Sequence, residues 1–280
     1  MGTPVVADVS AAVARSAQVL ARRPSALLFD FDGTLSELVD DPANASIEER
    51  SEAALHTLTG LVDLVGIVTG RAVRDVQTKL DTSQMVVVGN HGLEWVVRGQ
   101  HERHDAGLKA AEAVQEAIGE IRERLERDSL DQGVIFEDKD LSASIHYRMA
   151  PNQKQVGSVL IPLARRVAAN HGLRTTEGKF IVELRPRAEV SKGTAMGQLR
   201  EDFGLASMVF LGDDLTDVDG FKALRQLRES GVVESLAVGV LGSDTHPQVA
   251  LTADVAVSEV VGVADYLEKL IDALRTGEQA

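Results

Sequence analysis

LLFDFDGTL, at residues 27–35, is the stretch that decides the fold of this chain. Its apolar start ends in an acid, Asp30, which is the pattern of a strand buried on both faces of a parallel sheet. Asp30 and Asp32 are two residues apart, so their side chains point the same way while the chain stays extended. Gly33 allows a sharp backbone turn after them. The stretch therefore predicts a ligand site at the carboxyl end of a strand; the competing interpretation is a solvated Asp-Gly turn.

Apolar runs and helical patterns alternate on both sides of this stretch, as they do in a parallel sheet with helices on both faces. Strands are expected at 26–30, 64–69, 85–88, 208–211, 236–240 and 254–257, and helices at 47–59, 71–80, 192–203, 217–230 and 259–274. We therefore predict the α/β class.

The middle of the chain has a different rhythm, in which a helix is followed by two strands, twice over. Helices are expected at 106–127 and 153–169, and strands at 134–137, 142–147, 173–176 and 180–184. We predict an inserted αββαββ cap domain at 104–184, with 1–103 and 185–280 joining to form the catalytic core.

The composition excludes several classes of function. The 280 residues include 29 Lys and Arg against 43 Asp and Glu, a formal net charge of −14, so neither a nucleic acid nor an anionic membrane is expected as a partner. The absence of cysteine excludes a disulfide scaffold, a thiol nucleophile and a thiolate-ligated metal. No apolar run approaches the roughly 18 residues of a membrane helix, and we expect a cytoplasmic protein, with a monomer favoured.

A second group of acids follows the strand expected at 208–211, in the sequence GDDLTD at 212–217. Asp213, Asp214 and Asp217 would share a sheet edge with Asp30 and Asp32 if the two strands are neighbours. Two unit charges about 5 Å apart repel by roughly 3 kcal/mol at an effective dielectric near 20. Such a cluster needs protons or a cation, and carboxylate oxygens favour Mg²⁺. The alternative is acids that merely complement a helix N-terminus, which is an even choice for Asp217.

Two further segments suit a phosphate group. Thr69-Gly70-Arg71 offers a hydroxyl and backbone N–H groups at a helix start, and Lys192 begins another helix, where a local anion would explain a cation. With these segments Asp30 can supply a carboxylate nucleophile, and Asp32 can protonate the leaving alkoxide and then activate water. The cation, Lys192 and Thr69 would neutralise the transferred phosphoryl group.

This constellation resembles the haloacid dehalogenase superfamily of phosphohydrolases. The matching pieces are D-x-D-G-T at 30–34, Thr69, Lys192 and G-D-D-x-T-D at 212–217, in the order of the superfamily. The resemblance implies a Rossmann-like core, with Asp30 as nucleophile and Asp32 as general acid and base. It also implies Mg²⁺ held by the carboxylate of Asp30, the backbone carbonyl of Asp32 and Asp213. Asp214, also expected at the metal, and Asp217 would support this set.

Segments outside the catalytic four are similar to the trehalose-6-phosphate phosphatase family. They are VTGR at 68–71, GNHGLE at 89–94, EDK at 137–139, IHYR at 145–148 and EGKFIVELRP at 177–186. In that family, residues matching Glu137, Arg148, Lys179 and Glu183 contact the sugar. One departure is Val218, where the family usually carries an acid. His91 either touches the substrate or is a structural residue. The expected substrate contacts are Gly70, Arg71, Asn90, His91, Glu137, Arg148, Lys179 and Glu183.

The resemblance implies hydrolysis of trehalose 6-phosphate to trehalose and phosphate, the last step of trehalose biosynthesis. Another capped sugar phosphatase, acting on sucrose phosphate or mannosyl-3-phosphoglycerate, is the nearest alternative. A phosphomutase is a weaker one. A sugar-phosphate sensor without catalysis is the alternative from a different class, and the complete set of catalytic residues argues against it.

Overall fold

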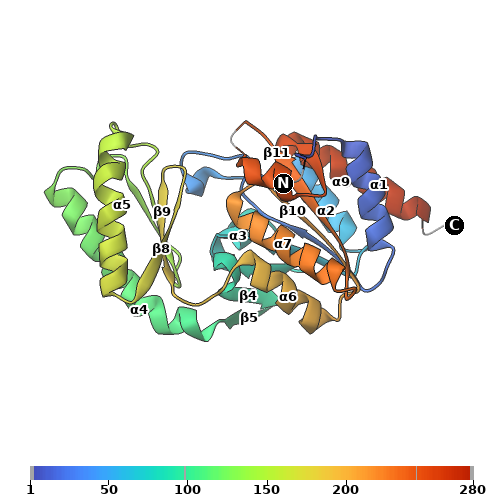
Figure 1. Ribbon diagram of the computed structural model, residues 1–280, viewed down its shortest axis with the longest axis horizontal. Coiled ribbons are helices and arrows are strands. Elements are labelled where there is room, and N and C mark those ends of the chain that lie inside the picture. Colours follow the sequence, from blue (N-terminus) through green and yellow to red (C-terminus); the bar gives the residue numbers. More distant parts are fainter. Residues whose placement is uncertain (1–2, 98, 244, 278–280) are drawn as a thin grey trace. The chain divides into compact units, whose positions relative to one another are not determined.

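The computed structural model describes residues 3–97, 99–243 and 245–277, and its chain divides into two compact units (Figure 1). The core unit comprises Met1–Val39, Asn44–His101 and Val190–Ala280. The inserted unit comprises Asp40–Ala43 and Glu102–Glu189.

The core unit is built on an eight-stranded sheet in the order β12-β11-β10-β1-β2-β3-β4-β5. All pairs from β12 to β3 are parallel, and β4 runs antiparallel to β3. The strands are β1 (Ser25–Phe29), β2 (Leu64–Val68), β3 (Val86–Gly89), β4 (Glu94–Val97), β5 (Gln100–Arg103), β10 (Ser207–Gly212), β11 (Glu234–Leu241) and β12 (Val255–Ser258). The expected parallel sheet is confirmed.

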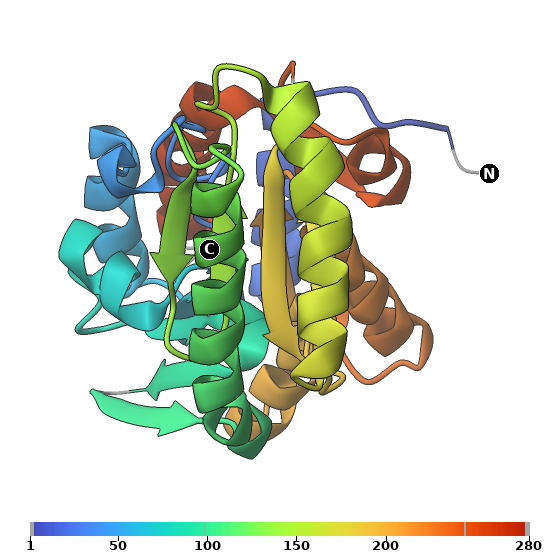
Figure 2. The same ribbon diagram turned by 90° about the vertical axis from the view of Figure 1, so that its left-hand side faces the viewer.

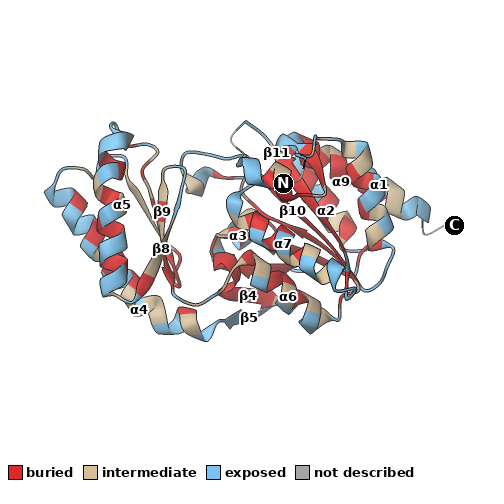
Figure 3. Ribbon diagram, in the orientation of Figure 1, coloured by how far each residue is buried: buried red, intermediate tan, exposed pale blue. Residues whose placement is uncertain are grey.

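Helices cover both faces of this sheet because the central strands are apolar on both sides. In β1, Leu27 and Phe29 pack with α1, α2 and α9, whereas Ala26 and Leu28 pack with α6, α7 and α8. The neighbouring β10 is buried along its whole length (red in Figure 3). The helices are α1 (Val9–Leu20), α2 (Glu49–Leu58), α3 (Val73–Lys79), α6 (Lys192–Phe203), α7 (Leu215–Glu229), α8 (Pro247–Thr252) and α9 (Glu259–Gly277), with short 3-10 turns at Pro42–Asn44 and Asn90–Gly92. The α/β class is therefore confirmed.

Three differences from the sequence prediction have local causes. The β4–β5 hairpin was not expected, because β5 is exposed along its whole length and shows no apolar alternation. The helix α8 has six residues, too few for a periodic pattern. The last strand begins at Val255, one residue later than expected, and the carboxylate of the preceding Asp254 accepts hydrogen bonds from Arg228 and from the N–H of Ala237.

The inserted unit is a four-stranded antiparallel sheet in the order β6-β7-β9-β8, with two helices packed side by side on one face (Figure 2). The elements are α4 (Asp105–Arg127), β6 (Ile135–Asp138), β7 (Ala143–His146), α5 (Gln153–Asn170), β8 (Leu173–Gly178) and β9 (Ile181–Pro186). Ala143, Ile145, Val182 and Leu184 point into the core beneath the helices. Alternation then places their neighbours on the opposite, polar face.

Within the described ranges, no helix is both long enough and apolar enough to cross a membrane.

Candidate active site

The candidate site lies next to β1, at the point where successive strands begin to be added on the other side of the core sheet. From β1 the chain first builds β2 and β3 on one side, and later builds β10, β11 and β12 on the other. Ligands of open α/β sheets bind at the carboxyl ends of the strands at such a switch point. Asp30 follows β1 directly, Asp213 follows β10, and Thr69 follows β2. Residues nearly two hundred positions apart therefore meet at one edge.

Three buried carboxylates and one buried ammonium group form the centre of the site. Asp30, Asp213 and Asp217 each place a carboxylate oxygen within 4.8 Å of the others. The Nζ of Lys192 lies 2.8 Å from Oδ1 of Asp30 and donates a hydrogen bond of 2.6 Å to Oδ1 of Asp217. Lys192 is 2% exposed, which shows how completely the cluster is withdrawn from solvent.

The backbone of the two motifs holds this cluster in place. Oδ2 of Asp217 accepts hydrogen bonds from the N–H groups of Asp213, at 3.1 Å, and Asp214, at 3.0 Å. Gly33 has a φ of +76°, and a Cβ there would lie 2.2 Å from Oδ2 of Asp213. A side chain at position 33 would therefore meet the carboxylate from β10, which explains why the turn after the two acids uses glycine.

Burial sets the protonation behaviour of the cluster. Burial, followed by the charge of Asp217, raises the pKa of Asp30 well above its usual value. Burial, followed by the charge of Asp30, raises the pKa of Asp213 in the same way. Burial alone would lower the pKa of Lys192, but Asp217 and Asp30 outweigh it and raise that pKa. Ionising all three carboxylates beside one ammonium group is therefore unfavourable, and a further cation would relieve that cost.

The donor set fits magnesium. The cluster offers carboxylate oxygens, which are hard ligands, and no sulfur or imidazole ligand belongs to it. Asp217 joins this set, whereas Asp214 is exposed at the N-cap of α7. The structure therefore brings together Asp30, Asp213, Asp217 and Lys192, and leaves Asp214 at their margin.

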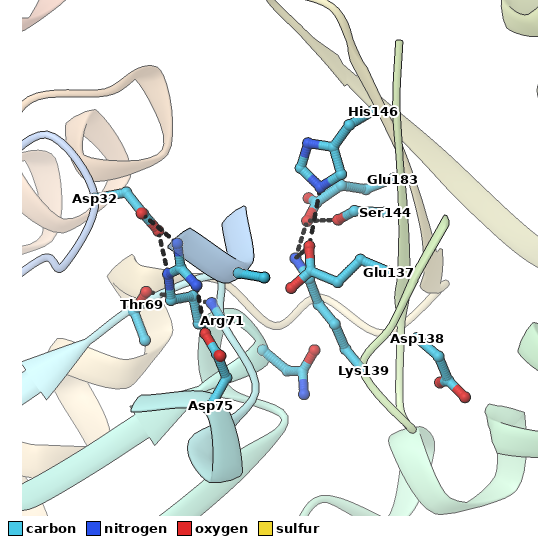
Figure 4. Close-up of polar contacts among 12 residues, drawn as sticks. Asp32, Thr69, Arg71, Asp75, Glu137, Asp138, Lys139, Ser144, His146 and Glu183 are labelled. Carbon is cyan, nitrogen blue, oxygen red and sulfur yellow. Dashed lines mark hydrogen bonds and ion pairs between the residues drawn. The ribbon is translucent and has the colours of Figure 1, made fainter. Parts of the chain in front are cut away.

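Asp32 and Arg71 form a separate ion pair (Figure 4). The Nε and Nη2 of Arg71 each donate a hydrogen bond of 2.7 Å, one to each carboxylate oxygen of Asp32. The Nη1 of Arg71 contacts Asp75, and the guanidinium lies 5.3 Å from the centre of the Phe31 ring. The hydroxyl of Thr69 accepts a hydrogen bond from the N–H of Arg71 at 3.2 Å. Sequence reasoning did not single out Asp75.

The segment of Asn90 and His91 packs against the Thr69-Gly70-Arg71 turn. The N–H of His91 donates a hydrogen bond of 2.9 Å to the carbonyl of Thr69. A Cβ at Gly70 would lie 2.6 Å from the His91 ring, so position 70 has no room for a side chain. The amide of Asn90 donates a 2.8 Å hydrogen bond to the buried carboxylate of Glu94, which also accepts from the N–H of Val73.

The polar face of the inserted unit carries a row of side chains across four strands. The strand register sets Glu137, Ser144, Glu183 and Thr176 opposite one another in turn. Glu183 accepts hydrogen bonds from Ser144, at 3.1 Å, and from Thr176, at 3.2 Å. The amino group of the buried Lys139 lies 3.1 Å from Glu183.

Other expected sugar contacts of this unit are arranged differently. Glu137 lies 2.9 Å from Nε2 of His146 and 3.7 Å from the Nζ of Lys139 (Figure 4). Arg148 lies 3.7 Å from Asp40, and Lys179 is exposed in the turn between β8 and β9. Lys139 and His146 lie in the EDK and IHYR segments, where the sequence indicates no role for them, and only the pairing of the strands shows that they adjoin the polar row.

Comparison with known proteins points to one family. The family model for trehalose-phosphatase matches residues 28–255. A trehalose-phosphate phosphatase of Mycolicibacterium paratuberculosis is 34% identical over 278 residues, which cover 97% of this chain and 68% of that protein. One of Mycobacterium bovis is 34% identical over 209 residues, or 72% of this chain and 52% of the relative.

Solved structures show the same fold. The C-terminal domain of the C. albicans trehalose-6-phosphate phosphatase superposes with a TM-score of 0.76 at 20% identity, covering 97% of this chain and 99% of that one. A haloacid dehalogenase-like hydrolase from Bacteroides thetaiotaomicron gives a TM-score of 0.62 at 14% identity over 89% and 100% of the two chains. With the family match over most of its length, the chain belongs to the trehalose-phosphatase family and is a phosphatase.

Proposed function

We propose that this phosphatase hydrolyses trehalose 6-phosphate to trehalose and phosphate, the last step of trehalose biosynthesis, with magnesium as cofactor. The observation that carries the proposal is the position of Asp30. Its carboxylate lies at the switch point of the sheet, buried against Lys192 and within reach of Asp213. A buried carboxylate beside a cation site suits a nucleophile in phosphoryl transfer.

In the proposed reaction the Asp30 carboxylate attacks phosphorus and forms an aspartyl phosphate. The bond from phosphorus to the sugar oxygen breaks as Asp32 gives its proton to that oxygen. Water then attacks the aspartyl phosphate, and its proton passes to Asp32, which frees phosphate and restores Asp30. Lys192 holds Asp30 in place throughout through the 2.8 Å contact.

Asp30 and Asp213 would hold the Mg²⁺ ion, with the backbone carbonyl of Asp32 as a third ligand. The bound ion neutralises charge on the transferred phosphoryl group. Asp217 has a positioning role in this proposal, because its two oxygens already accept three hydrogen bonds, from Lys192 and from two backbone N–H groups. Asp214, exposed at the N-cap of α7, would support the loop rather than bind the ion.

The inserted unit is the proposed cap domain and supplies the sugar contacts. Glu137, Lys139 and Glu183 combine charge with burial on one sheet face, and such groups bind sugar hydroxyls well. A site built to hydrogen-bond hydroxyl groups rejects ligands that leave its polar groups unpaired. Arg148 and Lys179 are proposed as further contacts from the same unit. Thr69 and the Gly70 N–H would receive the phosphate.

A phosphate-release panel tests the proposal. The purified chain with Mg²⁺ is given trehalose 6-phosphate, sucrose 6-phosphate, mannosyl-3-phosphoglycerate and glucose 6-phosphate. We expect kcat/KM for trehalose 6-phosphate to exceed the others by at least about 100-fold, the discrimination that a polar site achieves. A higher kcat/KM for another sugar phosphate would refute the substrate assignment. Conversion of glucose phosphates into one another, without release of phosphate, would indicate a mutase instead.

A further inference from the structure

Arg71 has an unusual environment for a residue expected to bind a phosphate. Its side chain is only 5% exposed, whereas that of its partner Asp32 is 35% exposed. The fork of Nε and Nη2 is the edge with which arginine binds oxyanions in pairs of hydrogen bonds. Here that edge is occupied, with both contacts at 2.7 Å, by the two oxygens of Asp32. A phosphate would have to displace Asp32 to use the same edge.

Two further contacts fix the guanidinium group of Arg71. Asp75, in the first turn of α3, contacts Nη1, and Cζ of Arg71 lies over the Phe31 ring, 5.3 Å from the ring centre. Burial alone would lower the pKa of Arg71, but Asp32 and Asp75 outweigh it and raise that pKa. Arg71 is therefore a buried cation held between two partly exposed carboxylates, those of Asp32 and Asp75.

We propose that Asp75 and Arg71 are positioning residues that orient the Asp32 carboxyl group for proton transfer, rather than binding the phosphate themselves. This inference rests on the proposed function, in which Asp32 is the general acid and base. It differs from the sequence expectation, which placed Arg71 among the substrate contacts.

The proton balance of the reaction fits such a support. A protonated Asp32 carries hydrogen on one oxygen, which then accepts more weakly from Arg71, so one of the two hydrogen bonds is weakened. When that proton passes to the leaving sugar oxygen, as the bond from oxygen to phosphorus breaks, both Asp32 oxygens become strong acceptors again. In the second half, Asp32 takes a proton from the attacking water and one bond weakens once more. Arg71 keeps the carboxyl group aligned through the stronger bond.

The first experiment compares leaving groups. The variants are Arg71→Lys, which loses the fork, and Asp75→Asn, which loses the anchoring charge. The readout is the rate of alcohol release in the first turnover, so that breakdown of the aspartyl phosphate does not contribute. The two substrates are trehalose 6-phosphate, whose alkoxide needs a proton, and p-nitrophenyl phosphate, whose phenolate leaves without one.

We expect both variants to slow trehalose release by about 10- to 100-fold, part of the roughly 10²- to 10⁴-fold that general acid catalysis supplies. Release of p-nitrophenolate should change by less than about 3-fold, and KM for both substrates should stay within a similar factor. Equal losses on both substrates, or a rise in KM as the main effect, would show that Arg71 binds the phosphate and would overturn the proposal. Arg74→Lys, at an exposed arginine of the same helix, is the matched control.

The second experiment is a double-mutant cycle with Asp32→Asn. If Arg71 acts through Asp32, then Arg71→Lys should slow the Asp32→Asn protein by less than about 2-fold, because the two effects are coupled. An undiminished loss in that background would contradict the proposal. Thermal unfolding checks that each variant folds.

The two experiments also separate this inference from the substrate assignment. Failure of the wild type to hydrolyse trehalose 6-phosphate would refute the proposed function alone. The double-mutant cycle can then be run with an alkyl phosphate that the phosphate-release panel shows to be hydrolysed.

Discussion

The two polar regions of this molecule are organised by opposite principles. In the core unit, the charged groups are at the ends of strands, and the backbone fixes them: Asp217 is bound by two N–H groups, and Gly33 is fitted against Asp213. In the inserted unit, the charged groups are in the middle of strands, and neighbouring side chains fix them, as Ser144 and Lys139 fix Glu183. The first arrangement suits a chemical step that does not vary. The second suits a binding surface whose specificity can change when its side chains are substituted.

The sharpest test of the core region is Asp30→Asn. Loss of the nucleophile should reduce kcat by at least about 10⁴-fold, as removal of a nucleophile does in other hydrolases. Because burial and the charge of Asp217 raise the pKa of Asp30, the neutral amide should leave the melting temperature unchanged or higher. Phosphate release and thermal unfolding measure the two effects.

The matched control is Asp219→Asn, at an exposed acid of α7 outside the carboxylate cluster. Substantial turnover by the Asp30→Asn variant would show that Asp30 is not the nucleophile and would remove the contrast between the two regions.

Lys192→Met removes the cation that the core cluster is built around. Uncompensated buried charge costs about 3–5 kcal/mol of stability. The pKa values of Asp30 and Asp217 are raised by burial, so protonation of both groups is more favourable in the folded than in the unfolded chain. Their contribution is therefore present at low pH and is lost as the pH rises through their folded pKa values.

The stability deficit of the Lys192→Met variant should accordingly grow from pH 5 to pH 8, measured by urea denaturation against the wild type. A deficit that shrinks over this range would show that the carboxylates are not the cause.

Magnesium should stabilise the core unit alone. An ion that binds only the folded state, at 100 times its Kd, adds about 2.7 kcal/mol to the free energy of unfolding. We expect Mg²⁺ to raise the melting temperature of the wild type and EDTA to abolish both this shift and activity. Asp213→Asn should lose the shift, whereas Glu183→Gln should keep it. An equal shift in both variants would place the ion outside the core cluster.

Glu183→Gln tests the inserted region, and its effect should be the smallest. The substitution removes the negative charge of Glu183, which pairs with Lys139 and accepts a hydrogen bond from Ser144. KM for trehalose 6-phosphate should therefore rise by about 10- to 100-fold, or about 1.4–2.7 kcal/mol. Turnover of p-nitrophenyl phosphate, which has no sugar, should not change. Glu177→Gln is the matched control, because Glu177 is on the same sheet but pairs with Arg165. A fall in kcat with both substrates would contradict the division of roles.

The same contrast explains what could be predicted from the sequence. The strand ends of the core are contiguous motifs, so the alternation of strands and helices, the parallel sheet and the meeting of residues 30 and 213 were indicated by local pattern. The selection of Asp217 over Asp214 did not follow, because it depends on which carboxylate turns inward to Lys192.

The polar row of the inserted unit was predicted only in part. Glu137 and Glu183 are 46 residues apart in sequence, and their connection through Ser144 depends on the register of three strands. A single sequence does not specify that register. The pairing of Arg71 with Asp32 and Asp75 was missed for a similar reason, since the sequence places an arginine near a phosphate site but does not show which anion it faces.

The central position of β1 has a consequence for synthesis on the ribosome. β1 is complete at Phe29, but its neighbour β10 begins only at Ser207. At about 5–20 residues per second, roughly 10–35 s pass before that partner is translated. Throughout this interval one hydrogen-bonding edge of β1, a strand that is fully buried in the folded protein, lacks its native partner and is open to pairing with other polypeptides. The carboxylate cluster of Asp30, Asp213 and Asp217 can form only after β10 has been made.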